Sequence, residues 1–258
     1  MRAAVREAQR ATGSPPPPPR RPRRWPGALA ALTLAAVLGG GLWALLLHPD
    51  TPLPPEWNPT RSLEVAHPVT PLTGWKLDRA AASGALCRAA LGPAGQAEVL
   101  PDVEASEQCH IRDRVRLSRV GEAAIGPVET RCAVALRLAM WERHALQPEA
   151  LARLGSPVAR IEEIGSYNCR AMRLASGETG RMSTHATAEA LDVTGVVLDD
   201  GRRLRLLADW SGDGPEAGFL KAARDGACDW FETVLSPDYN SLHADHFHLQ
   251  SRGWGLCR

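Results

Sequence analysis

The fold is decided by two stretches of sequence, STHATAEALD at residues 183–192 and HADHFHL at residues 243–249. Together they contain four of the eight histidines of the chain. In a β-strand, residues i and i+2 share a face, so His246 and His248 are expected to point the same way while Phe247 packs into the core behind them. The second stretch therefore predicts a short strand on which two imidazoles converge.

The first stretch supplies a histidine and a carboxylate. Asp192 is expected on a strand that begins near Ala190, and His185 on the loop that leads into this strand. A separation of seven residues lets the loop fold His185 back over Asp192. Two neutral imidazoles and one carboxylate suit zinc, whose catalytic sites keep three protein ligands and leave a fourth position for water. We therefore expect a zinc (Zn²⁺) site formed by His185, Asp192 and His248.

A hydrolytic zinc site also needs a general base near the water that acts as nucleophile. Zinc lowers the pKa of a bound water toward ~7 and polarises a carbonyl, which is what amide hydrolysis requires. His246 shares the face of His248, and Asp245 lies next to it, so both are candidate bases. Histidine clusters also cap loops or bind adventitious metal, so the spacing alone leaves a purely structural role open.

Elsewhere the pattern of apolar residues predicts both helices and strands. The Asp199-Asp200-Gly201 sequence is typical of a hairpin turn, because glycine tolerates positive φ. We expect helices at residues 80–91, 128–146 and 215–235, and strands at residues 115–120, 158–167, 191–198, 203–207 and 243–250. This order combines flanking helices with a small, mainly antiparallel sheet, so the predicted fold class is α+β.

The N-terminal part of the chain differs in composition from the rest. Residues 1–26 form a basic, proline-rich tail that is expected to stay extended and solvated. Residues 27–47 are an uninterrupted run of 21 uncharged residues, close to the ~20 that a helix needs to cross hydrocarbon. Residues 48–60 are rich in proline and are expected to form a stiff linker. The sequence thus predicts a tail, a transmembrane anchor, a linker and one folded domain at residues 61–258.

The apolar run has a competing interpretation as a cleaved signal peptide. The apolar region of a signal peptide is usually ~7–15 residues long and ends in a small-x-small site, which residues 43–45 do not supply. The arginines of the chain's first 26 residues precede the run, so the positive-inside rule keeps the N-terminus cytoplasmic. We therefore expect a single-pass protein of the inner membrane whose C-terminal domain is periplasmic.

All six cysteines lie after the apolar run, and no two of them form a CxxC pair. An even number of cysteines in an oxidising compartment indicates three disulfides, although six cysteines permit 15 pairings. We expect Cys87 to pair with Cys109 and Cys228 to pair with Cys257. The sequence does not favour any pairing for Cys132 and Cys169.

The charge of the chain is unevenly distributed. The net charge is +1, but seven arginines and one glutamate give residues 1–26 a charge of +6. The remainder is therefore mildly acidic, at −5, which disfavours nucleic acid as a partner of the folded domain. The sequence does not indicate a protein partner.

Four motifs stand out in the folded part: GSYNCR at residues 165–170, SxHxxxxAxD at residues 183–192, SPDYNSLH at residues 236–243 and HxDHFHL at residues 243–249. Together they resemble the bacterial extensin-like C-terminal domain family, over roughly residues 65–258. That family is similar in turn to the zinc D-Ala-D-Ala carboxypeptidases and murein endopeptidases, which share a fold with the Hedgehog signalling domain. The resemblance implies a Hedgehog-like fold and a zinc-dependent peptidase that acts on peptidoglycan peptides or a similar envelope amide.

Carried over residue by residue, the resemblance implies that His185, Asp192 and His248 are the zinc ligands. It also implies that His246 is the base, because the matching histidine of the murein endopeptidase branch lies beside the metal. In the carboxypeptidase branch the base is a glutamate at the position of Asp245, which is one methylene shorter. We favour His246 over Asp245.

The resemblance also singles out Arg170, which follows Gly165-Ser166-Tyr167 and matches an arginine that steadies substrate charge in some of those enzymes. The alternative, which the sequence favours equally, is that Arg170 is an exposed arginine beside a disulfide with no role in the site. Two departures from the pattern put catalysis in question: Ala188 replaces the usual glycine, and the carboxypeptidase glutamate is missing. They leave open a second function, a non-catalytic cell-wall binding or scaffolding module that retains the metal site.

Overall fold

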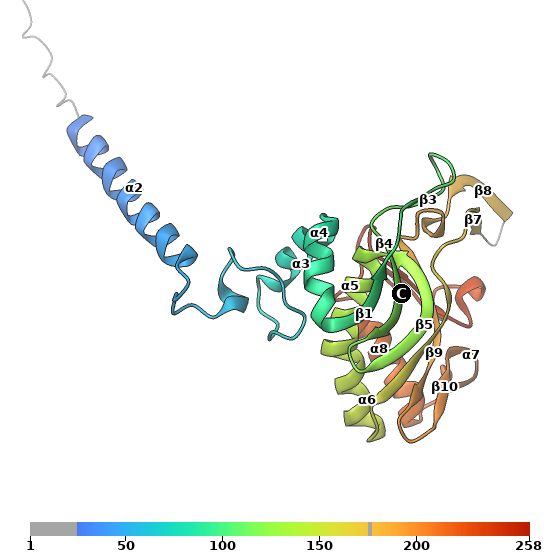
Figure 1. The fold of residues 1–258 in the computed structure, drawn as a ribbon. Coiled ribbons are helices and arrows are strands. Elements are labelled where there is room, and N and C mark those ends of the chain that lie inside the picture. Colours follow the sequence, from blue (N-terminus) through green and yellow to red (C-terminus); the bar gives the residue numbers. More distant parts are fainter. Residues whose placement is uncertain (1–24, 175–176) are drawn as a thin grey trace, which may run out of the picture. The chain divides into compact units, whose positions relative to one another are not determined.

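The computed structural model describes residues 25–174 and 177–258 (Figure 1). The chain divides into two compact units, Met1–Thr51 and Pro52–Arg258. The basic tail predicted at residues 1–26 lies, apart from its last two residues, outside the described residues. Within the described residues, the buried hydrophobic cluster and every disulfide belong to the second unit. The second unit therefore has the core and the cross-links that it needs to fold without the first.

The first unit contains one described helix, α2 (Trp25–Leu47). Its segment Gly27–Leu47 is long and apolar enough to cross a membrane, and none of its surface is buried against the rest of the chain. The hydroxyl of Thr33 donates to the Leu29 carbonyl at 2.9 Å, so the polar side chain is satisfied within the helix. Such a helix serves as a membrane span or as a signal sequence.

The second unit is an α+β fold built around a mixed sheet, and its class is the predicted one. Over the described residues the main sheet has nine strands in the order β1-β4-β5-β6-β9-β12-β11-β13, with β10 paired to β9. The sheet is thus larger than the small sheet that we predicted, and its β5–β6 and β11–β13 pairs are parallel. Its strands are β1 (Gly95–Val99), β4 (Arg114–Val120), β5 (Ala123–Arg131), β6 (Val158–Gly165), β9 (Ala190–Leu198), β10 (Arg203–Arg205), β11 (Thr233–Leu235), β12 (Phe247–Gln250) and β13 (Leu256–Cys257).

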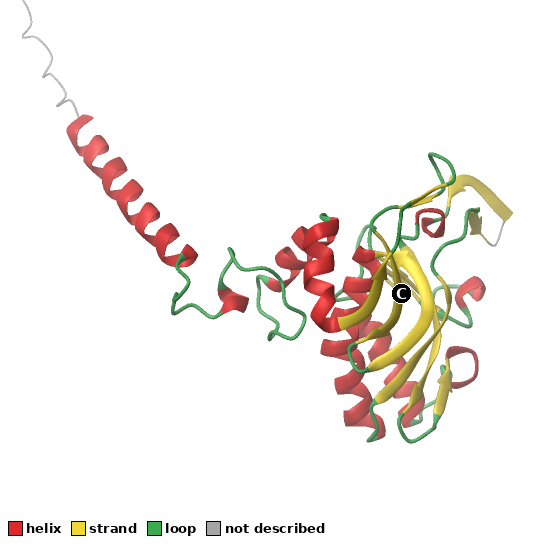
Figure 2. Ribbon diagram, viewed as in Figure 1, coloured by secondary structure: helices red, strands yellow, loops and turns green. Residues whose placement is uncertain are grey.

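Two small hairpin-like pairs lie outside the main sheet, β2 (Val103–Glu104) with β3 (His110–Ile111) and β7 (Ala171–Leu174) with β8 (Gly177–Met182). The longer helices of the second unit gather on one side of the main sheet (Figure 2). They are α3 (Thr73–Ala81), α4 (Gly84–Leu91), α5 (Cys132–Trp141), which continues through the π-helical turn η3 (Glu142–Leu146) into α6 (Gln147–Leu154), and α8 (Pro215–Ala227). The short α7 (Leu206–Asp209) follows β10 and lies beside it (Figure 1). Short 3-10 turns complete the unit: η1 (Pro55–Trp57), η2 (Gly92–Ala94), η4 (Thr184–Thr187) and η5 (Ser241–His243).

The core lies between the helices and the sheet. Its largest fully buried side chains include Trp141 of α5, Phe219 of α8 and Phe247 of β12. The indole Nε1 of Trp141 donates to the Ala223 carbonyl at 2.8 Å, which satisfies the polar atom of a buried tryptophan. Because Phe247 is buried on the helix side of the sheet, as predicted, the neighbouring residue of the same strand faces the opposite side.

The helix predicted at residues 128–146 is wrong at its start. Strand β5 continues to Arg131, and α5 begins directly after it. Val128 and Thr130 are β-branched and pair with strand β4, where branched side chains pack better than in a helix. The helical turns then run on through η3 into α6, which ends at a left-handed Gly155.

Two other predicted helices also end differently. The helix at residues 80–91 is divided, because Ser83 accepts a hydrogen bond from the Leu86 backbone and so begins α4 as an N-cap. The helix at residues 215–235 ends at Ala227, and the residues that follow turn back to form β11 beside β12. The predicted strands at residues 115–120 and 191–198 and the hairpin that joins β9 to β10 are confirmed. The strand predicted at residues 158–167 ends at Gly165, and the one predicted at residues 203–207 ends at Arg205, where α7 begins.

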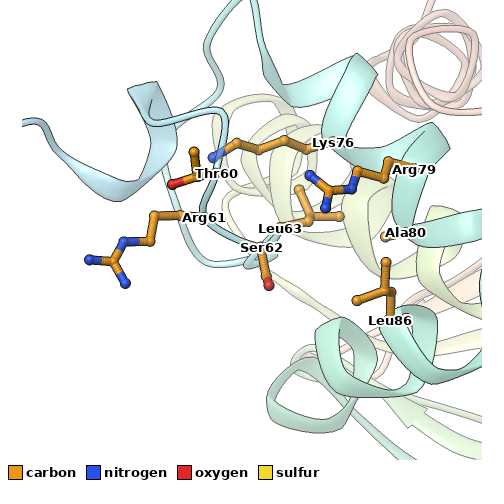
Figure 3. Close-up of a pocket in the computed structure, with 8 residues that line it drawn as sticks. All are labelled: Thr60, Arg61, Ser62, Leu63, Lys76, Arg79, Ala80 and Leu86. Atoms are coloured by element: carbon orange, nitrogen blue, oxygen red, sulfur yellow. The ribbon is translucent and has the colours of Figure 1, made fainter. Parts of the chain in front are cut away.

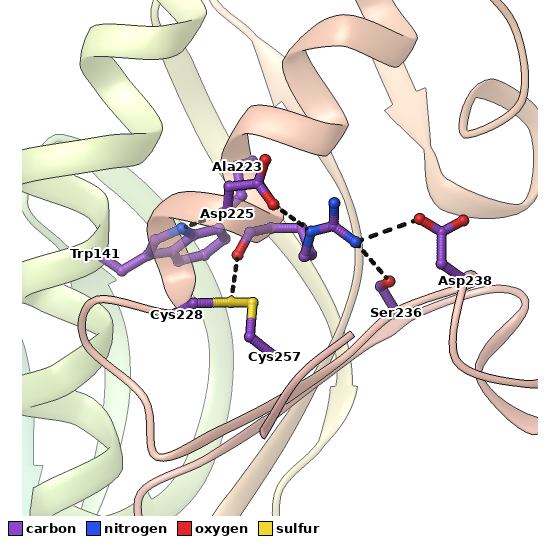
Figure 4. Close-up of a disulfide and its surroundings, with 8 residues drawn as sticks. Trp141, Ala223, Asp225, Cys228, Ser236, Asp238 and Cys257 are labelled. Carbon is purple, nitrogen blue, oxygen red and sulfur yellow. Dashed lines mark hydrogen bonds and ion pairs between the residues drawn. A yellow bond between two sulfur atoms is a disulfide. The ribbon is translucent and has the colours of Figure 1, made fainter. Parts of the chain in front are cut away.

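All six cysteines are among the described residues, and they form three disulfides: Cys87–Cys132, Cys109–Cys169 and Cys228–Cys257. The third is the predicted pair, and it ties the end of α8 to β13 (Figure 4). The predicted Cys87–Cys109 pair is wrong. The side chain of Cys87 points from α4 into the core toward the first residue of α5, with the two Cα atoms 6.1 Å apart, so closeness in space rather than in sequence selects the partner.

Loss of the Cys87–Cys132 disulfide is predicted to destabilise the second unit. The double variant Cys87→Ala/Cys132→Ala should lose about 3–4 kcal/mol of unfolding free energy, because the bond closes a long loop, and urea denaturation measures this loss. Cys228→Ala/Cys257→Ala, which opens a shorter loop, is the matched control and should lose less. Recovery of a Cys87–Cys109 peptide by non-reducing peptide mapping would contradict the pairing.

Candidate metal centre

Two neighbouring strands bring the predicted ligands together. β9 lies between β6 and β12, and the register places His248 directly opposite Asp192. On the other side of β9, Asp192 pairs with Gly165 at the end of β6. Residues that lie opposite each other on adjacent strands point to the same face of the sheet, so the imidazole and the carboxylate meet there.

The third predicted ligand, His185, lies on the 3-10 turn η4, which begins after Ser183 and ends at Ala188. Ala188 has φ 49° and ψ 33°, the left-handed conformation that glycine adopts most easily. This turn reverses the chain, so that His185 folds back over the strand that carries Asp192. The departure from glycine at position 188 therefore leaves the turn in place.

The three side chains converge on one point. The Nε2 atom of His185 lies 3.1 Å from Oδ2 of Asp192, and Nδ1 of His248 lies 2.8 Å from Oδ1 of Asp192. The two imidazole nitrogens are 3.2 Å apart. All three residues are buried, and one atom from each lies within 4.8 Å of the others. Ligand atoms at zinc distances of 2.0–2.1 Å are about 3.3 Å apart in a tetrahedron, so the donor set fits a zinc ion.

The outward nitrogens of both imidazoles face hydrogen-bond acceptors. Nδ1 of His185 lies 2.8 Å from the Ser166 carbonyl, and Nε2 of His248 lies 2.9 Å from Oε1 of Gln250. The Gln250 amide nitrogen donates to the Arg252 carbonyl, which leaves its oxygen turned toward His248. A neutral imidazole that donates through one nitrogen carries a lone pair on the other. In the tautomers that donate to these two acceptors, both lone pairs point into the centre, as in metal-ligating histidines.

Asp192 contributes the charge of the centre. Burial alone raises the pKa of this carboxyl group, but the hydrogen bonds and charges of His185 and His248 outweigh burial and hold its pKa well below the usual range. Asp192 is thus ionised at neutral pH, as a carboxylate ligand must be. With protons on their inward nitrogens, the two imidazoles donate to Asp192. In the tautomers that donate to Ser166 and Gln250 instead, all three inward atoms are acceptors and repel one another unless a cation lies between them, which is the electrostatic reason for expecting a metal here.

The two candidate bases lie at the edge of this centre. The strand predicted at residues 243–250 begins only at Phe247, because η5 precedes it, so His246 lies just before the strand. Its Nε2 nevertheless faces Oδ1 of Asp192 at 3.7 Å, and its Nδ1 lies 2.7 Å from Oδ1 of Asp245. Asp245 thus contacts His246 and fixes which of its nitrogens carries the proton.

Arg170 is placed differently. Its backbone carbonyl accepts a hydrogen bond from the Ser183 amide, at the start of the turn that carries His185. Its guanidinium donates to the adjacent Ala171 carbonyl at 3.3 Å. The described contacts therefore tie Arg170 to the architecture of the turn, and they give its side chain no bond to the three converging residues.

Four residues of the centre were not identified from the sequence. Ser166 and Gln250 orient the two imidazoles, and Thr184 donates to the Gln250 oxygen at 2.7 Å. The His243 ring lies tilted to that of His246 and edge-on to that of His248, with centroids 5.2 and 5.8 Å away. Burial, together with the charges of those two histidines, lowers the pKa of His243 to about 4, so it is neutral at neutral pH. Gln250 was within reach of sequence reasoning, since it lies two residues after His248 on one strand face.

Residues of the GSYNCR motif hold the turn that carries His185 in place. Gly165 ends β6 with φ 115°, and Ser166 is buried and bonds through its hydroxyl to the Ala190 carbonyl at 2.6 Å. The Asn168 amide donates to the His185 carbonyl at 3.0 Å, and the next residue, Cys169, is cross-linked to Cys109. The motif thus fixes both the backbone and the ring of His185.

Comparison with protein families matches residues 85–258 to the model of the extensin-like protein C-terminus, which is well over half of the chain. The chain belongs to this family. No curated protein and no solved structure matches it. All three disulfides, the converging residues His185, Asp192 and His248, and the contacts that orient them lie within the part that matches the extensin-like family. The apolar helix α2 and helix α3 lie before it.

Gln250 is predicted to strengthen metal binding by the extensin-like domain. Gln250→Leu removes the acceptor of the His248 Nε2–H, so zinc affinity should fall about 10–100-fold, as measured by competition with a chromophoric chelator. Gln250→Glu keeps an acceptor and should retain most of the affinity. Gln96→Leu, on exposed β1, is the control; an equal loss of affinity in this variant would contradict the assignment.

Ala188 is predicted to tolerate glycine but not a branched side chain. Ala188→Gly relieves the left-handed strain but removes a buried methyl group, so unfolding free energy should change by less than about 1 kcal/mol. Ala188→Val adds a β-branched residue to a left-handed position and should cost about 1–3 kcal/mol. Thermal and urea unfolding measure both; a neutral valine variant would argue against this conformation.

Proposed function

We propose that the extensin-like domain is a zinc-dependent peptidase that hydrolyses peptidoglycan peptides or a similar amide of the cell envelope. One observation carries the proposal: two imidazole nitrogens and the oxygens of one carboxylate meet within 3.2 Å of one another, and the outward nitrogens of both rings face acceptors. In the tautomers that donate to those outward acceptors, the inward atoms are all acceptors, which is what a divalent cation requires. When bound there, zinc supplies a Lewis acid that lowers the pKa of water toward ~7 and polarises an amide carbonyl.

His246 is the proposed general base. Asp245 accepts a hydrogen bond from its Nδ1, so Nε2 presents a lone pair on the side of Asp192 and can take a proton from a water beside the centre. The ionised Asp245 then stabilises the imidazolium that forms. Asp245 is therefore proposed as a positioning residue rather than as the base.

Two exposed side chains beside the centre are suited to contact a substrate. Tyr239 and Leu242 are each about two-fifths exposed, on the loop and turn that lead to β12. The Tyr239 ring lies edge-on to His243, with centroids 5.5 Å apart, and His243 contacts His246 in turn. A chain of rings thus links the surface to the proposed base. We propose this surface as the place where a peptide docks.

The proposed location is the periplasmic side of an inner membrane. Support comes from the uncharged helix α2, from the seven arginines that precede it, and from three disulfides after it, which persist in oxidising compartments. The resemblance of the motifs to those of zinc D-Ala-D-Ala carboxypeptidases and murein endopeptidases supports the choice of peptidoglycan peptides as substrate. The Hedgehog-like fold belongs to this proposal as well.

The test uses residues 52–258, which contain the whole core and all disulfides. The purified domain should contain about one zinc per chain by elemental analysis and should release fragments from muropeptides, as detected by chromatography. His248→Ala should lose both zinc and hydrolysis. His246→Gln should keep its zinc while turnover falls about 10²–10⁴-fold. His67→Ala, whose ring pairs with Glu64 outside the centre, is the control.

Three outcomes would overturn parts of the proposal. A domain that is loaded with zinc, binds sacculi and cleaves no muropeptide is the non-catalytic cell-wall module. A domain that purifies without zinc and keeps its stability after exhaustive chelation has a purely structural histidine cluster. Hydrolysis that survives in His246→Gln would remove this histidine from the base role.

A further inference from the structure

A small cationic pocket lies at the beginning of the second unit, far from the metal ligands in sequence (Figure 3). Lys76 and Arg79 extend from α3 toward the segment that contains Thr60 and Ser62, and Arg61 reaches outward from the same segment. The apolar side chain of Leu86, from α4, contributes to the wall. The lining of this pocket thus includes three basic residues and two hydroxyls and no acidic residue.

Lys76 is the unusual member of this set. The residue is only 5% exposed, and its ammonium group donates one hydrogen bond, to the Pro55 carbonyl at 2.6 Å. An ammonium group carries three donors, so two remain without an acceptor among the described residues. Burial lowers the pKa of Lys76, while the charges of Glu56 and Glu64, which line an adjacent pocket together with Lys76, raise it. A buried cation with open donors is costly unless an anion completes it.

Arg79 supplies a second charge at the mouth of the pocket. Its guanidinium stacks over the Trp75 ring, 5.6 Å from the centroid, and no carboxylate pairs with it among the described contacts. A planar guanidinium presents several donors to a phosphate oxygen, whereas an ammonium acts as a point charge. Lys76 and Arg79 together therefore form a site suited to a phosphate group.

The covalent connection to α2 favours a lipid as the source of that phosphate. Seven residues separate Leu47, at the end of α2, from Pro55, whose carbonyl bonds to Lys76. A chain of this length spans at most about 30 Å, so this part of the domain cannot leave the neighbourhood of the bilayer that α2 spans. A short tether also gives a millimolar effective concentration, so that weak binding is sufficient.

The residues around the pocket are those typical of a membrane interface. Trp57 and Trp75 are each 49% exposed, one on the turn whose carbonyl holds Lys76 and the other next to Lys76 in α3. Tryptophan concentrates at the level of lipid headgroups, and basic side chains there attract anionic lipids. We propose that this pocket binds the phosphate of an anionic phospholipid headgroup and docks the domain on the membrane that holds α2. The proposal rests on the membrane anchoring proposed above and is independent of the metal centre.

Vesicle sedimentation of residues 52–258 tests the proposal. The domain should partition at least about fivefold more onto vesicles that contain phosphatidylglycerol than onto pure phosphatidylcholine vesicles, since each basic residue near an anionic surface contributes about that factor. Arg79→Gln and Lys76→Met should each lose about fivefold. Arg203→Gln is the matched control, because Arg203 is an exposed arginine paired with Glu162 on the β6 side of the sheet. Circular dichroism checks that each variant is folded. If Lys76→Met does not fold, Arg79→Gln still tests the proposal, because Arg79 lies at the surface.

The following results would contradict the proposal. Equal binding to both vesicle types, or an equal loss in Arg203→Gln, would show that the pocket does not recognise the headgroup. Protection of the domain by inorganic phosphate without vesicle binding would assign the pocket to a free anion instead. Zinc content and muropeptide cleavage should be unchanged in Arg79→Gln. These two measurements test the peptidase proposal, whereas vesicle binding tests the headgroup proposal, so the failure of one is distinguishable from the failure of the other. N-terminal sequencing of the membrane-extracted full chain shows whether α2 is retained and thereby tests the anchoring on which docking rests.

Discussion

The pairing of β12 with β9 is the constraint on which the candidate centre depends. Its register sets His248 opposite Asp192, while the alternation of side chains sends Phe247 into the core. A slip of one residue would exchange the two faces, burying an imidazole among apolar side chains and exposing an aromatic ring. The hydrophobic core and the ligand set thus specify the same register. Because Asp192 is flanked by strands on both sides, the centre is built on the rigid part of the sheet, and only His185 comes from a turn.

That turn is held by contacts from several distant parts of the sequence. The Ser166 carbonyl fixes the His185 ring, the Asn168 amide fixes its backbone, and Thr184 reaches across to Gln250. Each contact restrains His185 or a residue that orients the ligands. The left-handed Ala188 is tolerated because the turn is restrained at both ends. The polar network beneath the imidazoles therefore stabilises the loop and sets their tautomers at the same time.

The sequence predicted the parts that follow from local periodicity. Alternation along residues 246–248, the His185–Asp192 spacing and the hairpin between β9 and β10 are properties of short segments. The wrong boundaries arose where tertiary contacts compete with local preference: Val128 and Thr130 lie in a strand because β4 is available as a partner. The Cys87–Cys132 pair and the Ser166 contact join residues that are distant in sequence, and no local pattern encodes them. The role of Gln250 as an acceptor for His248 could have been predicted from the sequence, since residues i and i+2 of a strand share a face.

The Cys109–Cys169 bond has a consequence for when the centre takes shape. It anchors the chain one residue after Asn168, so it restrains the segment that lies under His185. In a reducing cytosol these two sulfur atoms remain thiols, and hydrogen bonds alone would have to order that segment. If the domain is exported and binds a metal as proposed, the ligand cage would mature only after translocation.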